Sequence, residues 1–159
     1  MAELSGRLRP VGRVAIVVSR YNEVVTGRLL EGARACCVES GIADHDVDVL
    51  WVPGAFELVV ATDACAASGR YACVVALGAV IRGETPHFDF IASETTRGLG
   101  QVVLTHRIPV GFGLLTVDNL SQGRERAGGT AGNKGYEAAE AAIRATDLLQ
   151  QLRTDGARP

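Results

Sequence analysis

The feature that most constrains the fold is an apolar run from Cys73 to Ile81 that passes directly into a polar turn containing a glycine. The run has no polar alternation, which is typical of a strand covered on both faces of a parallel sheet. The segment 82–85 ends the strand, and Pro86 follows where a first helical residue tolerates a missing N–H group. Apolar residues then recur at helical spacing, so the sequence predicts a helix over 86–105 with Thr85 as its N-cap.

This turn has the properties of an anion site. Ligands of open α/β sheets bind where the carboxyl ends of parallel strands meet helix N-termini. The backbone N–H groups of Gly83, Glu84 and Thr85 are therefore predicted to hold an anion, and a phosphate fits best. His87 falls in the first helical turn, where an imidazole can move protons near neutral pH. The alternative is a capped helix start with an exposed histidine, and spacing alone does not decide between the two.

Strands and helices alternate along the rest of the chain. Apolar runs predict strands over 13–19, 46–52, 73–81 and 108–116. Periodic spacing and capping residues predict helices over 24–40, 55–68, 86–105, 119–126 and 134–153. The glycine-rich segment 128–133 is predicted to be a flexible loop. With right-handed crossovers, this alternation gives an α/β fold with a parallel sheet of four strands and helices on both faces.

Length and charge narrow the class of protein. With 159 residues, 47% of them hydrophobic, the sequence predicts one domain over 1–159, with a polar arm at 1–12 that only a neighbour would order and a flexible tail at 154–159. The net charge of -2 excludes the basic surface typical of nucleic-acid binding or of anionic membranes. A membrane-spanning or signal-type apolar segment is absent, so we expect a cytoplasmic protein.

The four cysteines do not have the paired spacing of a metal site. Three of them stand in apolar helix or strand contexts, where a free cysteine packs as a small hydrophobic residue. We therefore expect buried, reduced thiols at Cys36, Cys37, Cys65 and Cys73.

Other strand ends carry groups that suit a planar, polar ligand. Tyr21 could stack on a heterocycle, although packing is the commoner role of such an aromatic residue. Glu57 could accept hydrogen bonds from sugar hydroxyls, or simply favour a helix N-terminus in solvent. The backbone N–H and C=O groups of 79–81 could form hydrogen bonds with the amide edge of a heterocycle. Phe112 is expected near the end of the fourth strand, and Arg126 is either a phosphate ligand or a surface arginine.

Taken together, these segments resemble the 6,7-dimethyl-8-ribityllumazine synthases. The resemblance is carried, in order, by Tyr21-Asn22, VPGAFE at 52–57, GAVIRGETPHFDF at 78–90, the Phe112 region and ERAGGTAGNKGYEAA at 125–139. It implies a flavodoxin-like three-layer sandwich and the penultimate step of riboflavin biosynthesis. In that step 5-amino-6-(D-ribitylamino)uracil is joined to 3,4-dihydroxy-2-butanone 4-phosphate, with release of phosphate and water and without metal or cofactor.

The resemblance also implies roles for individual residues. His87 would transfer protons. The pyrimidine and the ribityl chain would contact Tyr21, Asn22, Ala55, Phe56, Glu57, Ala79, Val80, Ile81, Phe112 and Lys134. The phosphate would contact Gly83, Glu84, Thr85 and Arg126. The sequence departs from the family pattern with a tyrosine at 21, where Phe or Trp is frequent, and with Gly129-Thr130, where Thr-Lys is frequent; neither change removes a required group.

The resemblance further implies a homo-oligomer. Family members complete each active site across a pentamer interface, and the short loop at 128–135 is similar to that of members whose pentamers form an icosahedral shell. Riboflavin synthase is a possible protein partner. Nucleic acid and membrane are not expected partners.

Two other functions fit part of the pattern. One is a lumazine-binding or flavin-binding protein without turnover, which the retained His87 and Arg126 disfavour. The other is a phosphosugar isomerase, which needs a second general base, and Glu57 is the candidate for it.

Overall fold

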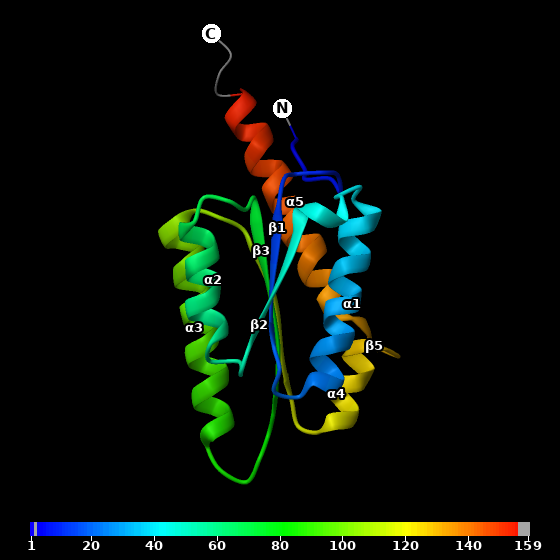
Figure 1. The fold of residues 1–159 in the computed structure, drawn as a ribbon, viewed down its shortest axis with the longest axis vertical. Helices are drawn as coiled ribbons and strands as arrows, with labels where there is room; N and C mark the ends of the chain where they lie inside the picture. The colour runs from blue at the N-terminus through cyan, green and yellow to red at the C-terminus, as the bar shows by residue number, and fades with distance from the viewer. Residues whose placement is uncertain (2, 156–159) are drawn as a thin grey trace.

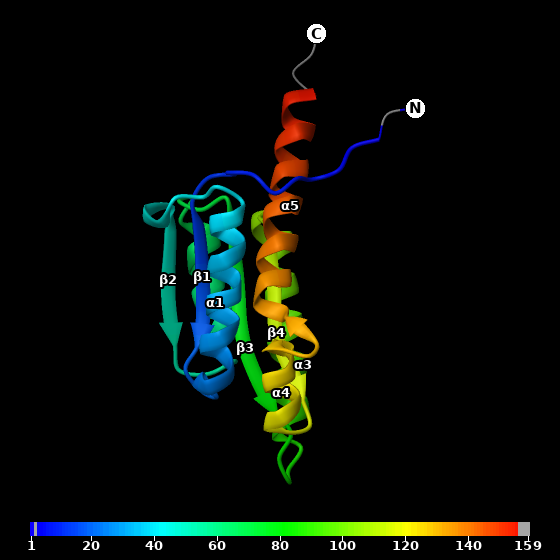
Figure 2. The same ribbon diagram turned by 90° about the vertical axis from the view of Figure 1, so that its right-hand side faces the viewer.

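A computed structural model describes residues 1 and 3–155 of the chain. Four parallel strands form its main sheet, in the order β2-β1-β3-β4. Their bounds are Val14–Ser19 for β1, Val47–Val52 for β2, Cys73–Ile81 for β3 and Val110–Val117 for β4. In the register, Ile16 of β1 lies opposite Val49 on one side and Val75 on the other. Figure 2 shows β1, β2 and β3 pointing the same way, and the parallel pairing of β3 with β4 gives β4 the same direction.

Helices cover both faces of this sheet, which confirms the predicted flavodoxin-like three-layer fold. Figure 1 shows α2 and α3 on one face and α1, α4 and α5 on the other. The helices are α1 (Glu23–Glu39), α2 (Leu58–Ala67), α3 (His87–His106), α4 (Leu120–Arg126) and α5 (Lys134–Asp155), with a short 3-10 helix at Asp44–Asp46. Within residues 1 and 3–155, no helix is long and apolar enough to span a membrane.

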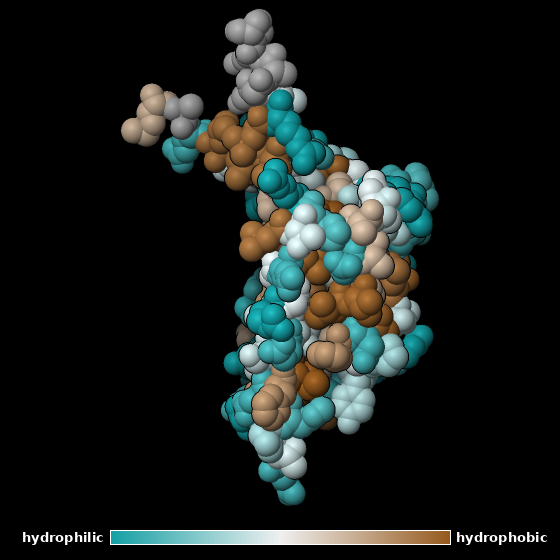
Figure 3. All heavy atoms as spheres, turned by 90° about the vertical axis from the view of Figure 1, so that its left-hand side faces the viewer, coloured by the Kyte–Doolittle hydropathy of each residue, from teal (hydrophilic) through white to brown (hydrophobic). Residues whose placement is uncertain are grey.

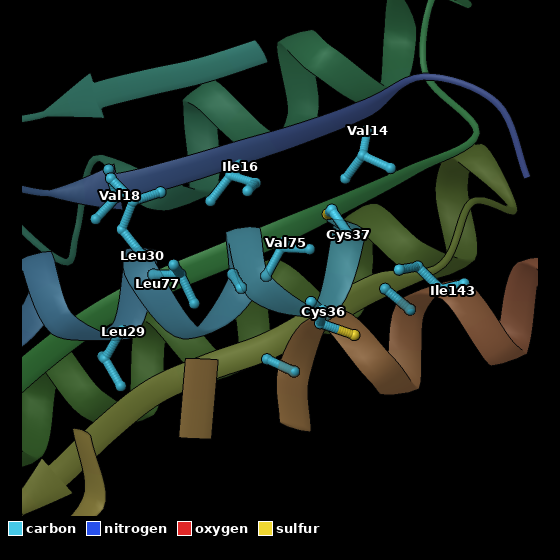
Figure 4. Packing of buried hydrophobic residues seen from close by; sticks show 14 of the residues in the cluster. Val14, Ile16, Val18, Leu29, Leu30, Cys36, Cys37, Val75, Leu77 and Ile143 are labelled. Atoms are coloured by element: carbon cyan, nitrogen blue, oxygen red, sulfur yellow. The ribbon is translucent and has the colours of Figure 1, made fainter. Parts of the chain in front are cut away.

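Alternating residues of β1 supply both halves of the core. Val14, Ile16 and Val18 pack with α1 and α5, as Figure 4 shows, whereas Ala15 and Val17 face α2. All five side chains are fully buried, and each of the larger ones contributes about 1.5–3 kcal/mol through the hydrophobic effect. This two-sided burial is the reason that the sequence of β1 shows no polar alternation. The structure also confirms the prediction for the cysteines, which are free and buried at Cys36, Cys37, Cys65 and Cys73.

The segment after α4 differs from the prediction. Instead of a flexible loop, residues 127–133 form a small antiparallel hairpin of β5 (Ala127–Gly129) and β6 (Gly132–Asn133). Gly128 and Gly132 adopt positive φ angles of 94° and 76°, which suit glycine. The Asn133 side chain donates to the carbonyl oxygen of Arg28 over 2.9 Å, which anchors the hairpin on α1. A long-range contact of this kind cannot be read from local sequence.

One predicted helix cap also differs, and the start of α1 has an unusual cap. The N-cap of α3 is Pro86 rather than Thr85, without a side-chain cap, because the fixed φ of proline already suits the first turn. Asn22 does occupy the N-cap position of α1, in a left-handed conformation with φ of 63°. Its side chain, however, donates to the carbonyl oxygen of Ala79 over 2.9 Å and does not cap the helix. Asn22 therefore ties the first βα turn to β3.

The arm at 1–12, of which residue 2 lies outside the described residues, is ordered by its own chain. The Arg7 N–H donates to the Asp147 carboxylate of α5 over 2.8 Å, and the Arg9 guanidinium pairs with the same carboxylate. Gln150 adds a hydrogen bond of 2.8 Å to the Val11 carbonyl oxygen. The expectation that only a neighbour orders this arm is therefore wrong. Helix α5 continues to Asp155, and residues 156–159 of the predicted tail lie outside the described residues.

Candidate active site

A cavity of about 550 Å³ opens at the carboxyl ends of β1, β2 and β3. The strand order places the topological switch point between β1 and β3, which is where ligands bind in flavodoxin-like folds. Backbone hydrogen bonds join the turns around the cavity, because the Arg20 N–H donates to the Val52 carbonyl over 2.8 Å and the Tyr21 N–H to the Pro53 carbonyl over 2.9 Å. The lining residues are Tyr21, Asn22, Gly54, Ala55, Phe56, Glu57, Ala79, Val80, Ile81, Gly83, Thr85, His87, Phe88 and Ile91.

Aromatic and apolar side chains form the walls of this cavity. Tyr21 is 75% exposed and Phe56 is 56% exposed, so the apolar faces of both rings are open to solvent. Phe88 and Ile91, on the first turns of α3, also line the cavity. Exposed aromatic faces beside an apolar wall can hold a planar ring by stacking. The site can therefore accept a flat heterocycle.

Two polar side chains on the cavity wall are fixed by the backbone. The Gly54 N–H donates to Oε2 of Glu57 over 2.9 Å. Within the described residues, Oε1 of Glu57 accepts no hydrogen bond, so it can accept one from a ligand hydroxyl. The Asn22 amide is oriented by its bond to Ala79, which leaves its Oδ1 as an acceptor at the cavity. Because these two side chains are already held in place, they can orient a ligand with little loss of side-chain entropy.

The turn between β3 and α3 presents free donors. Within the part of the chain that the structure describes, the backbone N–H groups of Gly83, Glu84 and Thr85 have no protein acceptor. A Cβ atom added at Gly83 would meet nothing within 4 Å, so the turn is open to a ligand. His87 is the first residue of α3, where the helix dipole adds positive potential. Free N–H groups at a helix start bind anions, and the adjacent imidazole can exchange protons with one. Glu84 itself does not line the cavity.

The remaining predicted residues line a second cavity of about 500 Å³ between β4 and α5. Phe112 is 49% exposed there. Arg126 donates to the Gln122 carbonyl over 3.2 Å, and Lys134 pairs with Glu137 over 2.6 Å. The two cavities share no lining residue. A single chain therefore does not unite these three residues with the cavity that holds His87.

The predicted position of Phe112 within its strand is wrong. The fourth strand was expected to end at 116 with Phe112 near its end, but β4 runs from Val110 to Val117 and Phe112 lies opposite Ala76. It is thus several residues from the edge that carries the other ligand groups. Phe112 lies between Gly111 and Gly113 and is exposed.

The sequence interpretation missed Phe88, Ile91 and Gly54 as lining residues. The helical apolar spacing did mark Phe88 and Ile91, but as core residues of α3. They reach the cavity because α3 begins beyond the end of the sheet. The role of Gly54 as a donor to Glu57 depends on a turn geometry that sequence spacing does not specify.

The buried thiols are not suited to nucleophilic chemistry. Burial raises the pKa of Cys37 to about 12 and the pKa values of Cys36 and Cys73 to about 11. These groups therefore remain thiols at neutral pH. Within residues 1 and 3–155, no three His, Cys, Asp or Glu side chains gather as a possible metal site.

Fold and cavity together define a flavodoxin-like α/β protein whose switch point carries a cavity with exposed aromatic rings, beside a turn whose backbone N–H groups have no acceptor in the described residues. Residues 12–150 match the 6,7-dimethyl-8-ribityllumazine synthase family. The chain is also 52% identical over 152 residues to the 6,7-dimethyl-8-ribityllumazine synthase of Gemmatimonas aurantiaca, which covers 95% of this chain and 93% of the relative.

The chain therefore belongs to the 6,7-dimethyl-8-ribityllumazine synthase family, and it is a transferase of riboflavin biosynthesis.

Proposed function

We propose that the cavity at the switch point is where 5-amino-6-(D-ribitylamino)uracil condenses with 3,4-dihydroxy-2-butanone 4-phosphate. The observation that carries this proposal is that three of the βα turns bring different groups to one cavity: an aromatic ring at Tyr21, an oriented carboxylate at Glu57, and free N–H groups beside His87. A planar pyrimidine, a polyol and a phosphate need these three kinds of contact.

Each part of the two substrates has a proposed position. The pyrimidine stacks on Tyr21 and meets the strand edge at 79–81, while the ribityl hydroxyls donate to Glu57. The phosphate accepts hydrogen bonds from the backbone N–H groups of 83–85. This arrangement places the reacting carbons near His87. Phe112 and Lys134 of a second copy close the pyrimidine side, and Arg126 of that copy clamps the phosphate.

The reaction needs repeated proton transfer. The pyrimidine amine attacks the ketone, and loss of water gives an imine. Phosphate then leaves, the ribitylamine nitrogen closes the ring, and a second water is lost. A positioned imidazole contributes about 10²- to 10⁴-fold to such steps. Alignment of two substrates contributes more, up to about 7–11 kcal/mol, so binding geometry is expected to dominate the rate enhancement.

A direct test mixes the purified protein with both substrates and follows lumazine absorbance together with phosphate release. Equal amounts of both products are expected. Folded protein that binds the pyrimidine but forms no product would favour the non-catalytic binding protein. Conversion of the phosphorylated butanone without any pyrimidine would favour the isomerase.

We also propose that the chain works as a homo-oligomer, because one site needs groups from both cavities. Two surfaces support this proposal. The second cavity is open along the sheet edge, and an apolar groove of about 700 Å³ runs between α2 and α3. Val60 and Leu104 are 68% and 81% exposed on these helices, and hydrophobic residues gather on this face in Figure 3. Apolar area of this kind is commonly covered by a partner.

Pentamers, assembled into an icosahedral shell, are the proposed form. The short connection from α4 to α5 leaves no inserted segment to block the stacking of pentamers. Light scattering should give the mass of a 60-chain particle, and a mass of five chains would support the isolated pentamer instead. A cytoplasmic location is proposed because four buried, reduced thiols fit a reducing compartment, and cell fractionation tests it. Riboflavin synthase, which would use the product, is the proposed protein partner, and co-purification tests it.

A further inference from the structure

The turn that presents the free N–H groups is held only at its ends. At one end, the Arg82 N–H donates to the Val117 carbonyl over 2.9 Å. At the other, the Asp89 N–H donates to the Pro86 carbonyl over 3.1 Å. The residues 83–85 between them are exposed and make no backbone hydrogen bond within the described residues. Ordering such a segment around an anion reduces affinity unless another group holds it in place.

The side chain of Arg82 crosses this turn. Its guanidinium carbon lies 4.3 Å from the centre of the Phe88 ring, and a terminal nitrogen lies 3.6 Å from the Asp89 carboxylate. The residue that precedes the turn therefore contacts the two residues that follow His87. These contacts link the two ends of the turn and so fix the distance that residues 83–85 span.

The same side chain also reaches the neighbouring strand end. Its Nε donates to the Asp118 carboxylate, which follows β4, over 3.1 Å. The planar guanidinium can stack on a ring and donate along its edge at the same time, which an ammonium group cannot do. Because Phe88 is buried on the first turn of α3, the contact ties the turn to the start of this helix.

We propose that Arg82 is a positioning residue that holds the 83–85 turn in the conformation that binds the substrate phosphate. The inference rests on the phosphate role proposed above for this turn. Arg82 acts through its contacts with Phe88 and Asp118. It is not itself a phosphate ligand, because its guanidinium already pairs with the carboxylates of Asp89 and Asp118. It should therefore affect the phosphorylated substrate and leave the pyrimidine unaffected.

The test uses inorganic phosphate as a competitive inhibitor together with steady-state kinetics of the assembled enzyme. Arg82→Gln should raise both the inhibition constant for phosphate and the KM for the phosphorylated butanone about fivefold, the size expected for an exposed cation–π contact and an exposed ion pair. The KM for the pyrimidine should stay unchanged. Arg34→Gln, which removes an exposed arginine of α1, is the matched control and should alter neither value.

Two further variants separate positioning from simple charge. Arg82→Lys keeps the charge but not the planar stack, so it should remain impaired about threefold or more for phosphate. Full recovery with lysine would overturn the proposal. In a Phe88→Leu background, Arg82→Gln should lose most of its additional effect, because the stacking partner is already gone. Effects of the two substitutions that simply add would mean that Arg82 does not act through Phe88, and would overturn the proposal.

The two proposals can fail separately. If phosphate does not compete with the phosphorylated butanone in the unmodified enzyme, the anion role of the turn is wrong, and the role of Arg82 falls with it. If phosphate competes but Arg82→Gln leaves its inhibition constant unchanged, or weakens both substrates equally, only the positioning role is wrong. Circular dichroism and particle size should match the unmodified enzyme in every variant.

Discussion

The two ends of the sheet differ in how their polar groups are used. At the amino-terminal end, Asp48 accepts hydrogen bonds from Tyr71 and Arg13, and Asp147 accepts from the arm. At the carboxyl-terminal end, the donors of 83–85 have no partner in the described residues. Buried polar groups need partners for stability, whereas a binding site must keep its groups available. We infer that one end stabilises the fold and that the other is free to bind ligands.

The shifted pKa values follow the same division. The hydrogen bond from Tyr71 and the Arg13 guanidinium lower the pKa of Asp48. The Arg7 N–H, followed by the Arg9 and Gln151 side chains, lowers the pKa of Asp147. Both carboxylates lie at the stabilising end and are more favourable when ionised in the folded protein. Substitutions at the carboxyl-terminal end should therefore change activity, and substitutions at the amino-terminal end should change stability.

The largest effect is expected at the carboxyl-terminal end. His87→Ala should lower turnover about 100-fold, because one proton-transfer group is lost while substrate alignment remains. The free energy of unfolding should stay within about 0.5 kcal/mol, since the side chain is exposed. His45→Ala, at an exposed histidine of the amino-terminal end, is the control and should change neither quantity. An unchanged turnover and pH profile in His87→Ala would refute the role of the imidazole.

The next effect is expected at the other end. Asp147→Ala should lower the free energy of unfolding by about 2–3 kcal/mol, because it removes a buried acceptor and leaves charged and amide donors of the arm unpaired. Chemical denaturation measures the loss, and Asp44→Ala at an exposed carboxylate is the control. Turnover at 25 °C should be unchanged. A loss of activity without loss of stability would contradict the division between the two ends.

A pair of tyrosines provides a reciprocal test with smaller effects. Tyr21→Ala should raise the KM for the pyrimidine about fivefold through lost stacking and leave stability unchanged. Tyr71→Phe should lower the free energy of unfolding by about 1 kcal/mol through the lost hydrogen bond to Asp48 and leave the KM unchanged. Kinetics and denaturation of both variants should show effects on opposite quantities, and a shared pattern would count against the comparison.

The smallest expected effect is a change in how the free energy of unfolding falls at low pH. Because the folded pKa of Asp147 lies below its unfolded value, its contribution is present above the unfolded pKa of about 3.9 and is lost as pH falls through the folded value. Asp147→Asn should therefore flatten the fall in stability below about pH 4, although it lowers stability at neutral pH. Denaturation curves between pH 7 and pH 3 measure this. A slope equal to that of the unmodified protein would show that the folded pKa is not depressed.

Local pattern was sufficient for the layers of the fold and for most of the first cavity. Continuous apolar runs place strands, and the groups at strand ends of a parallel sheet must share an edge, so Tyr21, Glu57 and His87 could be placed together. The hairpin at 127–133 and the docking of the arm could not be predicted. They depend on contacts of Asn133 with α1 and of Asp147 with the arm, which join residues far apart in the sequence.

The most direct test of the shared site mixes two variants that are each strongly impaired on their own. His87→Ala chains and Arg126→Ala chains are denatured and co-assembled, and mixing is verified by mass spectrometry of the particles. Because the two cavities of one chain share no residue, we expect an intact His87 of one copy to meet an intact Arg126 of another at some interfaces. Part of the lost activity should return, whereas activity that stayed at the level of the separate variants would show that both residues act from one chain.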